Sequence, residues 1–277
     1  MLEQPWHVRA TRYGLVAVAC LWSLVPILLV ILASLKEPKA IFEFPPSLIF
    51  TPTVDNYVRL WTAWPGFFAD LRNSLIVTTG ATLLTVLVSS AAGYVYARYS
   101  STLLTLSAFF MVVVRMLPPI IITLPLFPVV NWLRLNDTHI LLILLYATFF
   151  VSLSTWIMRA FIKQIPFELE EAAIIDGATL TQRLLRVVLP VAAQGIAAAA
   201  IFVLIFSWNE YIFALIFTTR NAKTAPVIIG EMLGTAEGVE WGVLFAAASI
   251  QLLPILIFVI LVQRLLIAGL TAGSMKG

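Results

Sequence analysis

Charged side chains are scarce in this sequence, because Asp, Glu, Lys and Arg together make up 11% of its 277 residues. A soluble domain usually carries about 25% of such residues, which keep its surface hydrated. Hydrophobic residues account for 61% of the chain, and its mean hydropathy is +1.00. This balance excludes a soluble globular protein. It also excludes a disordered chain, since disorder requires low hydrophobicity and high charge.

Cysteine, histidine and basic clusters are lacking as well. Cys20 is the single cysteine, which excludes a disulfide framework and a cysteine-rich metal site. His7 and His139 lie far apart, and no His, Cys and carboxylate cluster has the spacing of metal ligands. The net charge of +3 is spread along the chain without a basic stripe, so the sequence does not support nucleic-acid binding.

Long apolar runs are what the sequence has instead. A helix needs about 20 mostly apolar residues to cross about 30 Å of hydrocarbon. The predicted spans cover residues 13–35, 73–97, 103–130, 140–162, 187–217 and 241–265. Pro118-Pro119 interrupts the third span and must break or kink its helix, as a hinge or as a static bend. The sequence predicts an all-α membrane protein with one transmembrane domain over residues 1–277.

Lysine and arginine positions predict the orientation of these spans. The apolar run after Arg9 and Arg12 exceeds the roughly 7–15 residues of a signal peptide, so the first helix is expected to stay uncleaved. With the N-terminus inside, the cytoplasmic segments hold nine Lys and Arg residues and the outer segments hold seven. Cytoplasmic loops carry the basic excess, so we expect both termini in the cytoplasm.

The largest cytoplasmic loop, residues 163–186, has the pattern of a helix–turn–helix. Pro166 suits the first turn of a helix. Acidic residues follow near the positive end of the helix dipole, namely Glu168, Glu170 and Glu171. Asp176-Gly177 is a turn pair that ends this helix. Thr179 and Gln182 have the spacing of a capping box, which predicts the start of a second helix.

The residues of this loop allow two interpretations. One helix face carries Leu169, Ala172, Ala173 and Asp176 at helical spacing. Small side chains let a partner backbone approach closely, and the flanking glutamates offer hydrogen-bond acceptors, so the face suits docking of another protein. The alternative is a solvated amphipathic connector that only joins two spans.

The spacing within the loop resembles a family signature. Glu171-Ala172-Ala173, Gly177, Val187 and Leu189-Pro190 stand as in the EAA loop of bacterial ABC-importer permeases, where isoleucine is usual at the Val187 position. In that family the loop forms a coupling helix that docks on the ATP-hydrolysing subunit. The resemblance therefore implies the type I ABC-importer permease fold, with six transmembrane helices and a cytoplasmic coupling helix. It implies coupling roles for Glu171, Ala172, Ala173, Asp176, Gly177, Leu189 and Pro190.

Further motifs resemble the second permease of maltose-type importers: Asn56-Tyr57, Ala97-Arg98, Arg115–Pro119, Trp208–Glu210, Thr224–Pro226 and the C-terminal stretch from Gln263. The resemblance implies a subunit for import of a sugar such as trehalose or maltose, or alternatively of a sugar alcohol or glycerol phosphate. In maltose-type importers the tail of this subunit can reach between the ATPase subunits, and the resemblance leaves the same role open for Thr271–Gly277.

The resemblance also implies partners. These are a second permease subunit, two ATP-binding subunits, an extracytoplasmic solute-binding protein and lipid, in the inner membrane of a bacterial or archaeal cell. The sequence contains no G-x-x-x-x-G-K-[ST] loop, so ATP and Mg²⁺ are expected on the partner ATPase subunits and no cofactor on this chain.

Polar residues inside the predicted spans are candidates for a substrate path or gate: Arg115, Pro118, Pro119, Trp208, Asn209 and Glu210. A charge at the centre of a spanning helix costs about 2.5–3.5 kcal/mol on insertion scales, so it should face protein or water. Arg115 and Glu210 either form part of a polar sugar path, with Asn209 offering amide hydrogen bonds, or hold the bundle together as an ion pair or as snorkelling charges. Trp208 either stacks on sugar or packs in the bundle.

Two other function classes lack the motifs that they require in this sequence. An intramembrane enzyme needs a nucleophile–base pair or metal ligands, but no G-x-S-x-G motif occurs and His139 has no evident partner. An ion-coupled secondary transporter would usually carry paired repeats with broken helices, and no second half is visible in the sequence. Neither class is therefore favoured over an importer subunit.

Overall fold

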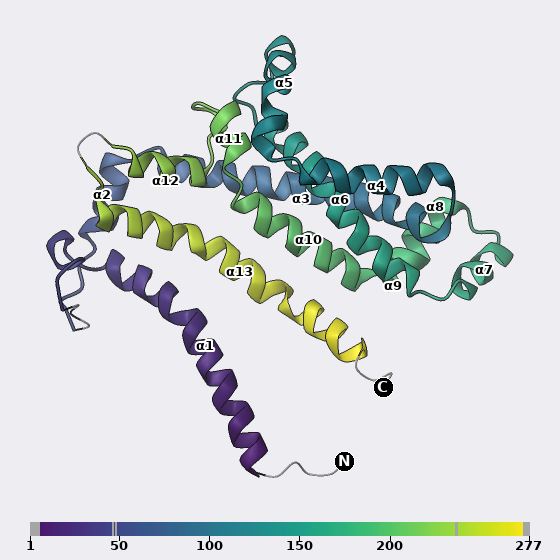
Figure 1. The fold of residues 1–277 in the computed structure, drawn as a ribbon, viewed down its shortest axis with the longest axis horizontal. Coiled ribbons are helices and arrows are strands. Elements are labelled where there is room, and N and C mark those ends of the chain that lie inside the picture. The colour runs from purple at the N-terminus through teal and green to yellow at the C-terminus, as the bar shows by residue number, and fades with distance from the viewer. Residues whose placement is uncertain (1–5, 46, 48, 236–237, 274–277) are drawn as a thin grey trace. The chain divides into compact units, whose positions relative to one another are not determined.

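The regular structure of the described chain is helical (Figure 1). The computed structural model describes residues 6–45, 47, 49–235 and 238–273, with side chains to residue 261. The helices are α1 (Trp6–Ser34), η1 (Pro38–Ala40), α2 (Asp55–Ala63), α3 (Phe67–Arg98), α4 (Thr102–Met116), α5 (Pro119–Trp132), α6 (His139–Lys163), α7 (Glu168–Ile175), α8 (Leu180–Arg183), η2 (Leu184–Val188), α9 (Leu189–Val191), α10 (Ala193–Trp208), α11 (Ile212–Phe217), α12 (Ala225–Leu233) and α13 (Trp241–Gly273).

Four of the described helices are long and apolar enough to cross a membrane, namely α1, α3, α6 and α13. Two bent pairs bring the number of candidate spans to six if each pair counts as one span. The first pair is α4 with α5, bent by 98°. The second joins Leu180–Val191 to α10 with a bend of 79°. The prediction of an all-α membrane protein is confirmed.

Both bends occur beside prolines. Helix α4 ends at Met116 and α5 begins at Pro119, so the predicted break at Pro118-Pro119 is confirmed. Proline lacks the backbone N–H that an interior helix position donates. The second bend lies within the predicted span 187–217 and follows Pro190, where a π-helical turn, η2, precedes α9. The helix α10 then ends at Trp208, before the shorter α11.

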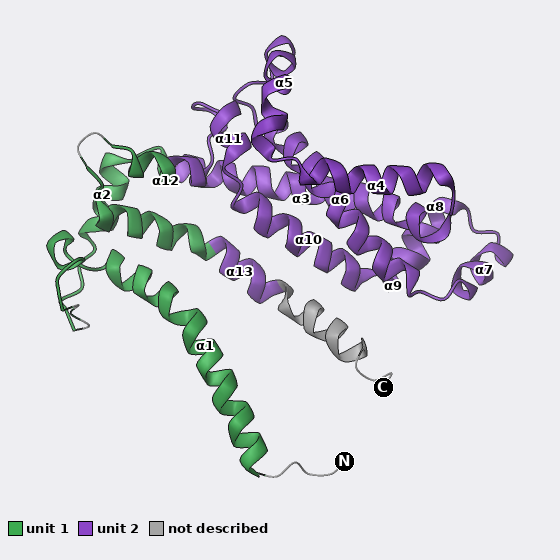
Figure 2. Cartoon of the chain, in the orientation of Figure 1, with its two compact units in different colours: residues 1–67, 229–253 green, residues 68–228, 254–277 purple. Residues whose placement is uncertain are grey.

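The chain divides into two compact units (Figure 2). Unit 1 comprises residues 1–67 and 229–253. Its buried Asn56 donates from Nδ2 to the carbonyl oxygens of Ser34 and Lys36, at 2.8 and 2.7 Å. The Tyr57 hydroxyl lies 2.7 Å from Ser34 Oγ. The Asn56-Tyr57 motif therefore fastens α2 to the end of α1. The expectation of a single domain stays a prediction.

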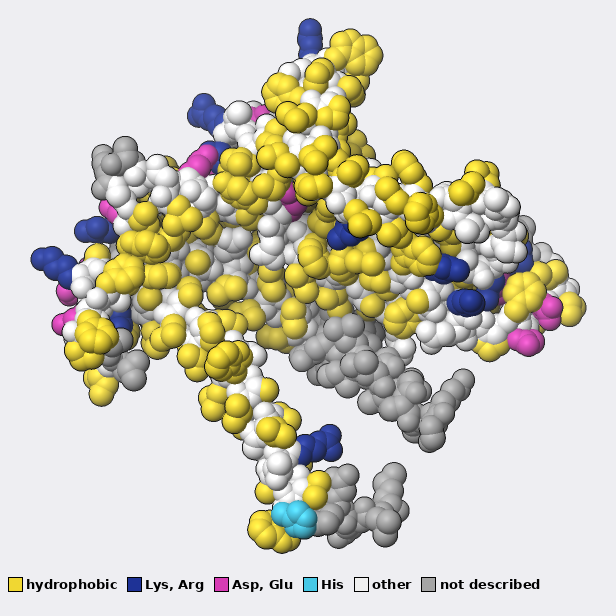
Figure 3. Space-filling model, in the orientation of Figure 1, with side chains coloured by type: hydrophobic (Ala, Val, Ile, Leu, Met, Phe, Trp, Pro, Cys, Tyr) yellow, Lys and Arg dark blue, Asp and Glu magenta, His cyan; other side chains and the backbone are white. Residues whose placement is uncertain are grey.

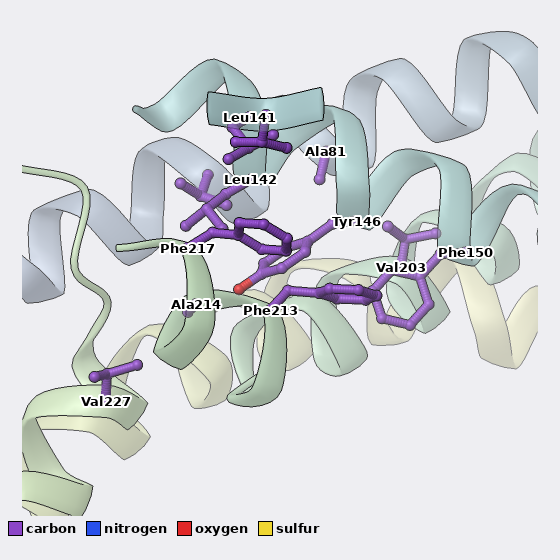
Figure 4. Close-up of a cluster of buried hydrophobic side chains, with 12 residues drawn as sticks. Ala81, Leu141, Leu142, Tyr146, Phe150, Val203, Phe213, Ala214, Phe217 and Val227 are labelled. Atoms are coloured by element: carbon purple, nitrogen blue, oxygen red, sulfur yellow. The ribbon is translucent and has the colours of Figure 1, made fainter. Parts of the chain in front are cut away.

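Unit 2 comprises residues 68–228 and 254–277 and contains α4 to α11. Helices α6 and α10 pack extensively against each other. Two glycines permit close helix approach, since a Cβ at Gly93 would lie 2.6 Å from Met158 Cβ and one at Gly195 would lie 2.7 Å from Phe161 Cβ. A cluster of buried side chains surrounds Tyr146, with Phe150 and Phe213 beside it (Figure 4). This aromatic core holds α6, α10 and α11 together.

Candidate functional site

The helix–turn–helix predicted in the cytoplasmic loop is present as α7 and α8. Two hydrogen bonds close α7, from the Gly177 N–H to the Ile174 carbonyl and from the Ala178 N–H to the Ala173 carbonyl. This pair is the Schellman motif, which requires a left-handed residue after the helix. Gly177 provides it with a φ of +79°. A side chain at this position would strain the backbone, because only glycine adopts this conformation freely.

The predicted capping box starts α8. The Gln182 N–H donates to Thr179 Oγ1 at 3.3 Å, and the Thr179 N–H donates to Gln182 Oε1 at 2.8 Å. The backbone groups at both ends of the turn between α7 and α8 thus have local hydrogen-bond partners. These hydrogen bonds fix the direction of α7 relative to α8.

The described chain leaves much of α7 uncovered. Glu171, Ala172, Asp176 and Gly177 are exposed, Ala173 is half-buried, and Ile175 is 86% exposed. Hydrophobic and acidic side chains lie side by side on this helix (Figure 3). Leu189 is half-buried and Pro190 exposed at the entry to α10. The residues of the predicted docking face are therefore accessible to another protein.

Glu170 behaves differently from its neighbours and was missed in the sequence. Its side chain is completely buried, whereas Glu168 and Glu171 are exposed. Its carboxylate accepts hydrogen bonds from Arg98 Nε and the Tyr94 hydroxyl, each at 2.6 Å. Three glutamates within four residues look alike in a sequence. The available signal was Arg98, a cation at the inner end of a predicted span that needs an acidic partner.

Arg115 and Glu210 do not form an ion pair in the structure, because each has other partners. Arg115 Nη1 donates to the Phe149 carbonyl at 3.0 Å, and the guanidinium carbon lies 5.0–5.6 Å from the ring centroids of Phe149, Phe150 and Phe202. Such cation–π contacts stabilise a guanidinium that is away from water. The Glu210 carboxylate accepts the N–H groups of Phe213 and Ala214, at 3.0 and 3.3 Å, and thereby caps α11.

The cavity beside Arg115 is mainly apolar. It has a volume of about 330 Å³ and is lined by residues of α4, α5, α6 and α11, among them Phe110, Val114, Leu126, Leu144, Phe149 and Phe213. Arg115, Thr148 and Ser152 are its polar lining residues. The several hydroxyl groups of a sugar would find few hydrogen-bond partners here. The geometry of Arg115 thus matches a role in holding the bundle more closely than a role in the sugar path.

The remaining candidates for the substrate path occupy different environments. Trp208 is buried, with 2% of its surface exposed. Asn209 is exposed, and its Nδ2 donates back to the Ile205 carbonyl at 2.8 Å. Pro118 precedes α5 and Pro119 is its first residue. Asn209 is thus an exposed polar side chain at the end of α10.

A polar network at the α6 N-terminus was not foreseen. The Asp137 carboxylate accepts backbone N–H groups of Thr219, Arg220, Asn221 and Ala222 at 2.9–3.2 Å. Partial burial works against its charge, but these hydrogen bonds outweigh burial and lower the pKa of Asp137 to about 2. Helix α3 joins the network through Asn73, whose Oδ1 lies 2.8 Å from His139 Nε2. His139 therefore has a structural partner.

The part of the chain that the structure describes has no candidate metal site, because no three His, Cys, Asp or Glu side chains are grouped there to hold an ion. The described chain has instead an exposed helix, α7, and helices that pack together in the membrane-spanning bundle. Such an arrangement suits transmission of movement and not bond cleavage.

Comparison with known proteins gives a consistent assignment. A family model described as "Binding-protein-dependent transport system inner membrane component" matches residues 86–271. The trehalose/maltose transport system permease protein MalG of Thermococcus litoralis is 35% identical over 95% of this chain and 94% of its own length. The trehalose transport system permease protein SugB of Mycobacterium tuberculosis is 36% identical over 92% and 93%.

A solved structure has the same fold. A bacterial ABC transporter involved in the import of the acidic polysaccharide alginate matches with a TM-score of 0.76 over 95% of this chain and 98% of that chain, at 19% identity. The family match extends across α7 and the turn after it, which confirms the resemblance seen in the EAA loop. This chain is thus a multi-pass permease subunit of an ABC importer, not an enzyme, and it belongs to the family of binding-protein-dependent transport system inner membrane components.

Proposed function

We propose that this chain is one of two permease subunits in an importer for a di- or oligosaccharide such as trehalose or maltose. The observation that carries the substrate class is the identity of 35% along 95% of the chain with a trehalose/maltose permease. The similarity to a trehalose permease supports the same class. The complex would contain a second permease, two ATP-binding subunits and an extracytoplasmic solute-binding protein.

The mechanism would be alternating access, with the energy supplied from outside this chain. The binding protein delivers sugar to the outer face, and the ATP-binding subunits, which hold ATP and Mg²⁺, close upon each other. Helix α7 receives this movement through its exposed residues Glu171, Ala172 and Ile175. Its short, hydrogen-bonded connections then carry the movement to the membrane helices.

A charged glycoside is the second candidate substrate. The sulfoquinovosyl glycerol transport system permease protein SmoH of Agrobacterium fabrum is 33% identical over 92% of this chain. Uptake assays with the complete complex in proteoliposomes would separate the candidates. Labelled trehalose and maltose should be taken up, and a charged glycoside should not compete with them. Uptake of the charged glycoside alone would move the assignment to that class.

Gly177 provides a sharp test of docking at α7. Its φ of +79° strains any substituted side chain, yet a Cβ there meets no atom within 4 Å. Gly177→Ala and Gly177→Trp therefore suffer the same backbone strain, about 1–2 kcal/mol for an L-residue. Only Trp adds bulk at the docking face. We expect Gly177→Trp to lose sugar uptake and binding of the ATP-binding subunits, and Gly177→Ala to keep most of both. Equal behaviour of the two variants would contradict docking at this turn.

A further inference from the structure

One glutamate of α7 faces the protein interior. Glu170 has no exposed side-chain surface, and Arg98 retains 10% of its own. Arg98 Nε lies 2.6 Å from Glu170 Oε1, while the Tyr94 hydroxyl donates to Glu170 Oε2 at 2.6 Å. Both partners of Glu170 belong to the last two turns of α3. Helix α7 is thus joined to α3, a helix from which it is more than 60 residues away in the sequence.

Arg98 also holds the connection that leads into α7. Its Nη2 donates to the Ile165 carbonyl at 3.0 Å, and its guanidinium carbon lies 5.7 Å from the ring centroid of Phe167. One guanidinium therefore contacts the end of the α6–α7 connection and the first turn of α7 together. The planar fork of arginine suits such simultaneous contacts.

The surroundings of this pair are rigid. Tyr94 and Ile165 belong to a buried cluster with Met158, Ile162 and Val188, which come from α6 and η2. The absent side chain of Gly93 allows α3 to contact Met158 of α6 directly. The ion pair is thus surrounded by closely packed helices. Such helices transmit a displacement, whereas a loop would deform.

Stability alone is a weak reason for such a pair. Removing two charges from water is costly, and buried pairs are often replaceable by hydrophobic residues without loss of stability. What hydrogen-bonded charges do provide is a defined geometry, since charge-assisted bonds are short and directional. The pair therefore sets the position of α7 relative to α3.

We infer that Arg98 and Glu170 are positioning residues for coupling, which transmit movement of α7 to α3 when the ATP-binding subunits close. This inference rests on the proposed function of α7. It assigns the transmission to a non-covalent connection with α3, in addition to the covalent connections of α7 with α6 and α8. Without the pair, α7 would still bind its partner but would move with less effect on the bundle.

The test uses the complete complex, with its second permease, ATP-binding subunits and binding protein, in proteoliposomes. Glu170→Gln keeps the shape and removes the charge. We expect the sugar transported per ATP hydrolysed to fall about tenfold, a change that loss of a hydrogen bond to a charged group can produce. The subunit composition should remain that of the wild-type complex. Glu37→Gln, an exposed carboxylate outside α7, is the control for loss of a charge and should leave the ratio unchanged.

A double-mutant cycle sharpens the result. If the two residues act as one unit, Arg98→Gln should give at least the defect of Glu170→Gln, because Arg98 also binds the Ile165 carbonyl. The double variant should be no worse than Arg98→Gln alone. Additive defects would overturn the inference, and so would a normal ratio in Glu170→Gln or an equal loss in Glu37→Gln. Should Glu170→Gln fail to assemble, the double variant R98L/E170L removes both buried charges and should restore assembly. Its ratio should stay low, and a wild-type ratio would refute the role.

These outcomes differ from failure of the proposed function. A wild-type complex that takes up no sugar would contradict the proposed function itself. A wild-type complex that transports sugar, together with a fully coupled Glu170→Gln variant, would leave the function intact and exclude the ion pair as the transmitting contact.

Discussion

In unit 2, single side chains form hydrogen bonds with several backbone groups of a segment that is distant in the sequence. Asp137 binds four consecutive N–H groups of residues 219–222. Asn73 Nδ2 donates to the carbonyls of Asn221 and Lys223, each at 3.0 Å. Residues 219–225 contain little regular structure, so their backbone groups need such partners. The connection between α11 and α12 is thus held in place by side chains of α3 and the α5–α6 loop.

Asp137→Asn should lower the stability of the protein at neutral pH. A pKa of about 2, below the usual value, means that the carboxylate stabilises the folded state above about pH 4 and loses this contribution as the pH falls through about 2. We expect Asp137→Asn to cost about 1–2 kcal/mol at pH 7, with allowance for partial screening by solvent. Thermal unfolding in detergent at several pH values measures the effect.

The difference in melting temperature between wild type and Asp137→Asn should shrink between pH 4 and pH 2. Glu37→Gln, an exposed carboxylate outside this network, is the control and should melt like wild type at each pH. A difference that stays constant over this pH range would show that the carboxylate charge is not what stabilises the connection.

Residue-level features were predictable from sequence where the chemistry is local. Gly177 and the Thr179–Gln182 capping box depend on residues within a few positions, and their geometry matched the expectation. The Arg98–Glu170 pair and the Asp137 network join residues more than 70 positions apart. Their existence depends on which helices pack together, and helical spacing alone does not contain that information.

At the scale of elements, prolines and glycines decide where helices bend and how closely they approach. The break after Met116 followed from Pro118-Pro119, because proline cannot continue a helix interior. The bend of 79° after Val191 was not foreseen, since Pro190 could equally occupy a first helical turn. The π-helical turn that precedes it has no distinctive pattern in residues 184–188.

Gly93→Ala should disturb the packing of α3 on α6. The added Cβ would lie 2.6 Å from Met158 Cβ and 3.0 Å from the Arg159 backbone nitrogen, so the helices must separate. Overpacking of this kind typically costs about 1–3 kcal/mol. We expect a lower melting temperature in detergent and a weaker yield of intact complex.

Gly14→Ala is the matched control for this substitution. It is also helical, but its Cβ would meet no atom within 4 Å, and alanine favours the helix over glycine. It should melt at or above the wild-type temperature. Equal destabilisation by both variants would mean that the loss comes from the helix backbone and not from the contact between α3 and α6.

At the scale of the whole molecule, the apolar surface is as informative as the core. Hydrophobic side chains cover the visible faces of α1 and α5 in Figure 3. None of the most apolar window of α1 is buried within this chain. Lipid or a second permease must cover such a surface, because exposed apolar area of this extent is unfavourable in water.

The orientation of the spans can be tested with cysteine labelling, since Cys20 is the single cysteine of the chain. On a Cys20→Ser background, Lys39→Cys should react with a membrane-impermeant maleimide from outside the cell, and Lys163→Cys should react only after permeabilisation. Both lysines are exposed. The expectation follows from the basic excess on the cytoplasmic side. The reverse labelling pattern would invert the predicted topology and place α7 away from any ATP-binding subunit.

The contact between Asn56 and Gly242 has a consequence for how relatives of this chain can diverge. Asn56 is buried, and its carboxamide occupies the space in which a side chain at position 242 would begin. Any larger residue at 242 would collide with the amide that fastens α2 to α1. A larger residue at 242 therefore requires a smaller side chain at 56. Across the family we expect glycine at position 242 wherever asparagine stands at 56, and a larger residue at 242 only where the side chain at 56 is smaller.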